Sequence, residues 1–231
     1  MRLRLLPTAN PVTAVTKPTH RPPLDYLPRE ASFLDPLRED GDSPEAARAV
    51  VIPFGLEASV SYGSGTAPGP QAILEASHHL EPGGLELWRE AYKDYGIAAL
   101  RQPVLEPTVE GALRQLSGIV EGVLEAGRFP FVIGGEHSLT AGAINPFAAS
   151  FNDLVVLHFD AHADLRDGYL GERYSHAAAM RRVLDHEHIE LVSVGIRAIC
   201  QAEADFIDAN RDRVTIHWGK DQARWDIEEI V

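Results

Sequence analysis

Three things are scarce in this sequence of 231 residues, and each scarcity excludes a class of protein. It has one cysteine, Cys200, so an internal disulfide is impossible and a reducing compartment is expected. Lysine and arginine number 21 against 34 acidic residues, a net charge of −13 that argues against nucleic acid or an anionic membrane as partner. No apolar run approaches membrane-spanning length, and the start, MRLRLLPTANPV, lacks the apolar stretch of a signal peptide. We therefore expect a cytoplasmic protein.

The alternation of apolar and amphipathic runs predicts the fold class. Eight of the 16 prolines precede residue 45, so residues 1–48 are expected to form a proline-rich, irregular segment. Residues 49–231 are expected to form one α/β domain, with a mainly parallel sheet covered by helices on both faces. The expected strands are 49–54, 94–100, 129–133, 154–159, 190–196 and 213–218. The expected helices begin near Pro70 and span 108–126, 138–149, 176–187 and 202–210, with a last helical run in DQARWDIEEIV.

Two of these strands end in residues that bind metals. The apolar run FPFVI is followed by GGEHS, whose glycines allow a tight turn before His137. The run LVVLHF is followed by DAHAD, in which Asp160, His162 and Asp164 alternate with small alanines and would point the same way on an extended backbone. Ligands collect beyond the carboxyl ends of strands in open α/β sheets, so His137 could complete a cluster with these three side chains.

Polar residues are common in the loops that follow strands, so His137 by itself is explained equally well by an ordinary loop and by a functional site. An ordinary loop explains Asp160, His162 and Asp164 less well. Two carboxylates aimed at one point repel each other unless a cation or protons lie between them. Mixed carboxylate and imidazole ligands suit manganese, zinc or iron, and the share of carboxylates favours manganese. A bridging carboxylate would allow two metals, which lower the pKa of a bound water to about 7.

Four segments together resemble the ureohydrolases, the arginase and agmatinase family. They are GGEHS, DAHAD, YSHAAAMRR at 174–182 and the loop VSYGSGTAPGPQAI, and their order and spacing are similar to the family's. The resemblance covers roughly residues 49–231 and is closest to agmatinase. It implies an arginase-like fold of three layers.

The resemblance also implies a centre of two manganese ions. His137 would bind one metal and His162 the other, Asp160 would bridge them, and Asp164 would join His137 at its metal. His176, in YSHAA, would be the catalytic histidine that moves protons or steadies the substrate.

The implied reaction is hydrolysis of a small cationic guanidino substrate by a metal-bridging hydroxide. Arginases hold the substrate's α-carboxylate with an asparagine- and serine-containing stretch, whereas this chain has LRDGYLGERYSHAAAM, which resembles agmatinases. Agmatine is therefore the expected substrate, with putrescine and urea as products, although guanidinobutyrate and other guanidines stay open. Family members commonly form trimers or hexamers, so a homo-oligomer is expected.

The chain departs from the family pattern in two places. Glu136 replaces the aspartate of the commoner GGDHS, a variation that agmatinase-like members share, and it would support the ligands. The family's second metal motif, D.D..DP, and a later substrate-contacting glutamate have no counterpart before Val231. The resemblance thus implies a truncated chain whose missing C-terminal strands belong inside the sheet. Asp226 and Glu228 have the spacing of the absent pair, but a helical pattern turns them about 200° apart.

Two alternative functions are kept. One is a related metal-dependent deacetylase, which shares an aspartate–histidine metal motif, although GGEHS and YSHAAAMRR argue against it. The other is a catalytically inactive remnant that binds one metal or only partner chains, and the absent aspartates favour it.

Overall fold

The computed structural model describes residues 24–34, 36–38, 43–81, 83 and 88–230. Much of the expected proline-rich segment lies outside these residues. Within them, the strands are β1 (Ala49–Phe54), β2 (Ile97–Ala99), β3 (Phe129–Gly134), β4 (Leu154–Phe159), β5 (Ile189–Ile196) and β6 (Val214–Trp218). The α-helices are α1 (Gly69–Ser77), α2 (Tyr92–Tyr95), α3 (Val109–Glu125), α4 (Thr140–Ser150), α5 (Ala179–Val183), α6 (Gln201–Ala209) and α7 (Ile227–Ile230). No helix in this part of the chain is long and apolar enough to cross a membrane.

All six expected strands are present, and three expectations about helices and ends need correction. β2 is shorter than 94–100 because the residues before it form α2, which ends where Gly96 takes a φ of 65°. The helix expected over 176–187 is a 3-10 turn, η5 (His176–Ala178), followed by the short α5. The last run is broken into η6 (Gly219–Arg224) and α7, because Trp225 between them is extended.

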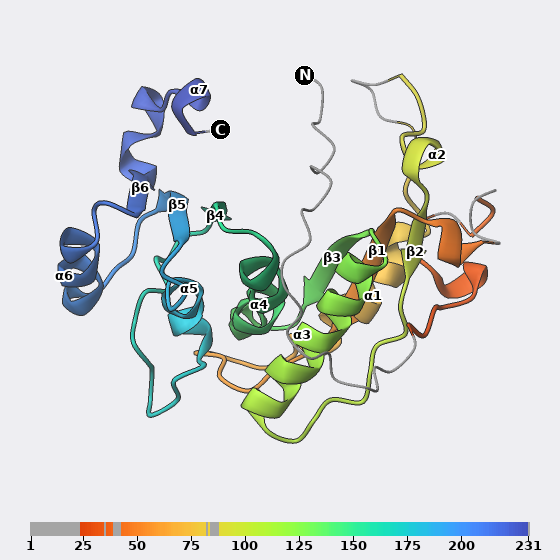
Figure 1. Cartoon of the computed structure of the whole chain (residues 1–231), viewed down its shortest axis with the longest axis horizontal. Helices are drawn as coiled ribbons and strands as arrows, with labels where there is room; N and C mark the ends of the chain where they lie inside the picture. Colours follow the sequence, from red (N-terminus) through yellow and green to blue (C-terminus); the bar gives the residue numbers. More distant parts are fainter. Residues whose placement is uncertain (1–23, 35, 39–42, 82, 84–87, 231) are drawn as a thin grey trace.

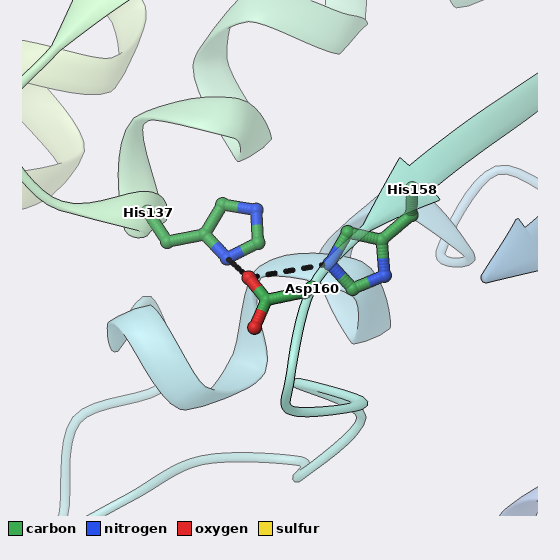
Figure 2. Close-up of side chains that lie close together, drawn as sticks. All are labelled: His137, His158 and Asp160. Carbon is green, nitrogen blue, oxygen red and sulfur yellow. Dashed lines mark ion pairs between the residues drawn. The ribbon is translucent and has the colours of Figure 1, made fainter. Parts of the chain in front are cut away.

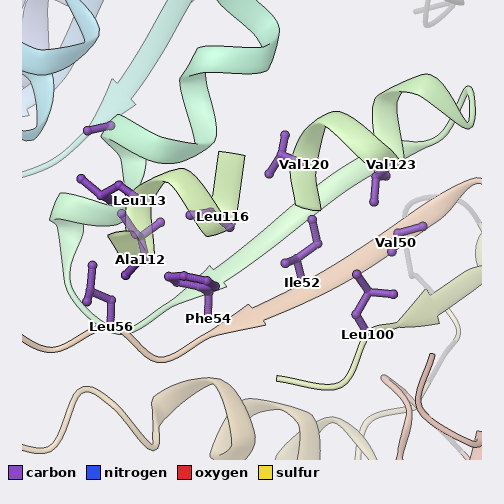
Figure 3. Close-up of a cluster of buried hydrophobic side chains, with 12 residues drawn as sticks. Val50, Ile52, Phe54, Leu56, Leu100, Ala112, Leu113, Leu116, Val120 and Val123 are labelled. Carbon is purple, nitrogen blue, oxygen red and sulfur yellow. The ribbon is translucent and has the colours of Figure 1, made fainter. Parts of the chain in front are cut away.

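Helix α3 shows how the local sequence builds the core. The Thr108 side chain caps its start by accepting a hydrogen bond from the Gly111 N–H, and Gly127 follows its end with a φ of 70°. Leu116, Val120 and Val123 lie on one face of the helix and are fully buried. Figure 3 shows this face packed over β1, which supplies the opposite side of the same hydrophobic cluster.

The strands form two parallel sheets. Their orders are β2-β1-β3 and β4-β5-β6, and every ladder within them is parallel, as the alternation predicts. Helix α4 joins the two halves, since it contacts both α3 and α5 (Figure 1). The α/β class is confirmed, but within the described residues the sheet is divided between β3 and β4.

The expectation that helices cover both faces is wrong for the two strands at this division. On β3, alternate side chains such as Phe129 and Phe131 are exposed, and on β4 the same holds for Val155, Leu157 and Phe159. β1 is instead buried along nearly its whole length, as expected for a strand covered on both faces. Thus β3 and β4 each have an unpaired edge and an uncovered apolar face among the described residues.

We expect these exposed strands to drive self-association, because unpaired apolar strands pair with other chains. Changing both Phe131→Ser and Leu157→Ser should lower the apparent mass measured by light scattering across a concentration series. The matched control is Val104→Ser, which changes an exposed side chain outside both sheets. Equal association of the double variant and the parent chain would contradict this role of the two strands.

Candidate metal centre

The turn after β3 places Glu136 and His137 beside the segment that follows β1. Gly135 donates its N–H to Phe54 O at 3.2 Å, and Glu136 donates to Leu56 O at 2.8 Å. A Cβ atom at Gly135 would lie 2.2 Å from Leu56 O, so only glycine allows this approach. His137 then begins a 3-10 turn, η4 (His137–Leu139), at the carboxyl end of the strand.

The end of β4 brings Asp160 and Asp164 to the same place. The Nδ1 atom of His137 lies 2.6 Å from Asp164 Oδ2 and 3.8 Å from Asp160 Oδ2. Asp164 has a φ of 50°, an unusual backbone conformation that accompanies the placement of its buried carboxylate against His137. Three of the four predicted metal ligands, His137, Asp160 and Asp164, therefore converge. The two carboxylates beside the imidazole of His137 favour binding of a positive charge at this place.

His162 is placed differently from the other predicted ligands. Its backbone N–H donates to Asp160 Oδ1 at 2.8 Å, while its Nδ1 lies 3.5 Å from the same oxygen. Its side chain is 66% exposed, against 28% for His137 and 10% for Asp164. The exposed ring of His162 thus lies near Oδ1 of Asp160, whereas His137 lies near Oδ2.

His158 is a member of the cluster that the sequence reasoning missed. Figure 2 shows it projecting from β4 toward Asp160, with His137 on the other side of the carboxylate. Its Nε2 lies 3.6 Å from Asp160 Oδ2, and its ring centroid is 5.4 Å from that of His137. The available signal was a histidine in an otherwise apolar strand, two positions before an aspartate and therefore on the same face.

Burial and neighbouring charges shift the pKa of two groups in this cluster. Burial lowers the pKa of His158, and the nearby His137 lowers it further. Burial alone would raise the pKa of Asp160, but the His162 N–H and the histidines His137 and His158 outweigh it, so the pKa lies below its ordinary value. Near neutral pH the cluster therefore combines an ionised Asp160 with a neutral His158.

All five predicted site residues line one cavity of about 650 Å³. They are His137, Asp160, His162, Asp164 and His176. The opposite wall comes from the loop after β1, where the lining residues include Ser61 and Tyr62. Segments from both halves of the chain therefore line the cavity that holds the predicted ligands.

Glu136 organises the loop after β1. Its carboxylate is buried and accepts hydrogen bonds from Ala58 N at 2.7 Å, Ser59 N at 2.6 Å, Ser59 Oγ at 2.9 Å and Ser138 Oγ at 2.5 Å. These four donors compensate the buried charge, and none of them belongs to a cation. Support of the ligands by Glu136 stays a prediction. The structure adds that Glu136 holds the loop after β1.

The same loop holds His176. Ser59 Oγ accepts the His176 backbone N–H at 2.9 Å and lies 3.2 Å from the ring Nδ1. The ring Nε2 lies 2.8 Å from Ser61 Oγ, and the ring of Tyr169 meets it edge-on with centroids 5.9 Å apart. Among the described residues, the recorded polar contacts of this ring are to two serines 115 and 117 residues earlier.

The donors present fit a metal such as manganese. One ligand atom from each of His137, His158 and Asp160 lies within 4.8 Å of the others, and the Asp164 carboxylate adjoins them. The Nε2 atom of His158 is buried and makes no hydrogen bond among the described residues. It can bind a cation directly if unprotonated, or donate to the Asp160 carboxylate if protonated. Mixed carboxylate and imidazole ligands are those expected for manganese, zinc or iron.

Glu136→Gln should loosen the loop after β1. An amide NH2 in place of one carboxylate oxygen would face N–H and O–H donors, which leaves buried donors without an acceptor at a cost of about 1–3 kcal/mol each. Faster hydrogen exchange at the Ala58 and Ser59 amides should reveal this, while the exposed control Glu110→Gln leaves them unchanged. Unaltered protection in Glu136→Gln would show that the carboxylate does not hold the loop.

Asp167 should contribute stability that is lost in acid. Its Oδ1 lies 2.6 Å from Nη2 of Arg182, which is 2% exposed, and this hydrogen bond lowers the pKa of Asp167. A lowered carboxyl pKa stabilises the fold above the ordinary value of about 4, and the contribution disappears as pH falls through the lowered pKa. Asp167→Asn should therefore unfold at lower urea concentration at pH 7.

The difference between Asp167→Asn and the parent chain should shrink steadily below about pH 4. The exposed Asp153→Asn serves as the matched control. If the difference in urea midpoint between Asp167→Asn and the parent chain stays constant from pH 7 to pH 2, the charge of Asp167 does not stabilise the fold.

Comparison with known proteins identifies the family of this chain. Residues 47–231 match the Arginase family. A relative named N(1)-aminopropylagmatine ureohydrolase from Synechocystis sp. is 35% identical over 184 residues, which cover 77% of this chain and 59% of the relative. A protein of the same name from Thermus thermophilus is 40% identical over 163 residues, or 68% of this chain and 54% of the relative.

A solved structure supports the fold. The agmatine ureohydrolase of Thermoplasma volcanium is 27% identical, has a TM-score of 0.69, and is matched over 87% of this chain and 68% of its own. The chain spans less than two thirds of the length of the two curated relatives described above. The family match covers most of the chain and includes every site residue discussed here, so the chain belongs to the arginase family.

Proposed function

We propose that this chain takes part in manganese-dependent hydrolysis of a guanidino compound, with agmatine as substrate and putrescine and urea as products. The observation that carries the proposal is the convergence of His137, Asp160 and Asp164 at one end of a cavity. The chain belongs to the arginase family, and the relatives described above are named ureohydrolases. Both findings support the same chemistry.

In this proposal His137, Asp160, His162 and Asp164 would hold two manganese ions, with Asp160 between them. The ions would supply a nucleophile from water at neutral pH. The carboxylates of Asp160 and Asp164 would also attract the cationic guanidinium, which has to lie beside them to react. His176, whose ring lies beside Ser59 and Ser61 and lines the same cavity, would hand a proton to the departing amine.

A second substrate deserves equal testing. The two relatives described above bear the name N(1)-aminopropylagmatine ureohydrolase, and this substrate is longer than agmatine by an aminopropyl group. The cavity of about 650 Å³ lies within the size range of small-molecule sites and offers room for either substrate. The fully exposed Tyr62 lies in the wall that a longer substrate would pass.

The experiment is a urea assay on the whole chain after manganese loading. Agmatine and N(1)-aminopropylagmatine are the test substrates, and arginine, which carries an additional carboxylate, is the control. We expect urea from at least one test substrate and much less from arginine. Asp160→Asn should lower manganese affinity by more than about 10-fold and abolish urea release, since it removes the central charge.

The exposed Asp153→Asn is the matched control and should keep both properties. Manganese bound at full occupancy without urea from any of these guanidines would overturn the enzymatic proposal. That result would favour the alternative of a metal-binding chain without catalysis.

A further inference from the structure

His158 has one satisfied nitrogen and one that faces the metal cluster. It lies directly opposite Ser193 in the register of β4 with β5, and its Nδ1 is 3.0 Å from Ser193 Oγ. Its side chain is 5% exposed. Its Nε2 is buried, makes no hydrogen bond within the described part of the chain, and lies 3.6 Å from Asp160 Oδ2.

The surroundings of Ser193 determine which nitrogen of His158 carries the proton. Ser193 is completely buried, and a buried hydroxyl that donates to nothing is costly. Within the described residues, the hydrogen bond recorded for this hydroxyl is the one to His158 Nδ1. If the hydroxyl donates, Nδ1 must accept, and in a neutral imidazole the proton then belongs to Nε2. Nε2–H is therefore directed at the Asp160 carboxylate.

We propose that His158 is a positioning residue that orients Asp160 through an Nε2–H donor set by Ser193. The inference rests on the proposed metal site, because Asp160 is the carboxylate that would bridge the two ions. The present separation of 3.6 Å exceeds a hydrogen bond, so the proposal requires the Asp160 carboxylate to turn toward Nε2.

The two orienting donors act on different oxygens of Asp160. The His162 backbone N–H binds Oδ1 at 2.8 Å, and His158 faces Oδ2. Each carboxylate oxygen has two lone pairs. On each oxygen, one lone pair would accept the orienting hydrogen bond, and the other would stay free for a cation. This arrangement prepares the carboxylate to bridge, as outer partners commonly do for metal ligands.

The direct test is the protonation pattern of the His158 ring in the metal-free whole chain. Histidine ¹⁵N shifts and long-range ¹H–¹⁵N correlations distinguish the two neutral tautomers, and the His158 signals are assigned by their loss in His158→Gln. We expect a single Nε2–H tautomer in the parent chain and a mixture in Ser193→Ala, which removes the donor to Nδ1. An Nδ1–H tautomer in the parent chain would overturn the proposal.

Metal affinity supplies the second test, measured by the electron paramagnetic resonance signal of free Mn²⁺ during titration. His158→Phe keeps the ring shape without a donor and should weaken binding by about 10- to 100-fold. His158→Gln, whose amide nitrogen can donate from near the Nε2 position, should recover most of that loss. The exposed His79→Gln should match the parent chain.

Three titration outcomes have distinct meanings. Unchanged affinity in His158→Phe would overturn the positioning role. Equal loss in His158→Phe and His158→Gln would overturn it in favour of direct coordination by His158. A parent chain that binds no Mn²⁺ would refute the proposed function, and the tautomer measurement would still decide the relation between Ser193 and His158.

Discussion

The candidate site depends on one constraint, the meeting of the carboxyl ends of β3 and β4, because His137 follows the first strand and Asp160 follows the second. Neither strand pairs with the other within the described residues, yet His137 and Asp160 come within 3.8 Å of each other just beyond their ends. Each strand is held by its own neighbour, β3 by β1 and β4 by β5. A slip of one residue in either ladder would turn the following ligand to the opposite face.

Two carboxylates near the cluster have different environments and therefore different uses. Glu136 is buried and receives four hydrogen bonds, so its capacity to accept is taken up by the fold. Asp160 is partly exposed and receives one recorded hydrogen bond on Oδ1, which leaves Oδ2 facing two imidazoles. The contrast separates a residue that builds the loop from one that is available to a cation.

The sequence was sufficient to predict the strands, the helix α3 and the five side chains that line the cavity. Those predictions depend on local patterns: continuous apolar runs, amphipathic runs, and polar residues at strand ends. The exposed faces of β3 and β4 could not be predicted in this way, because an apolar strand has the same sequence whether or not it is covered. The contacts of His176 with Ser59 and Ser61 join segments more than 100 residues apart, and no local pattern records them. His158 was missed because a single histidine inside a strand is usually explained by core packing.

The central claim is that His137, Asp160 and Asp164 together form a metal site. Its most direct test is elemental analysis of the purified chain after loading with manganese and extensive dialysis, compared with protein concentration. We predict that at least one manganese ion is retained per chain, and two if His162 binds a second ion. Retention of no manganese by the folded chain would contradict it.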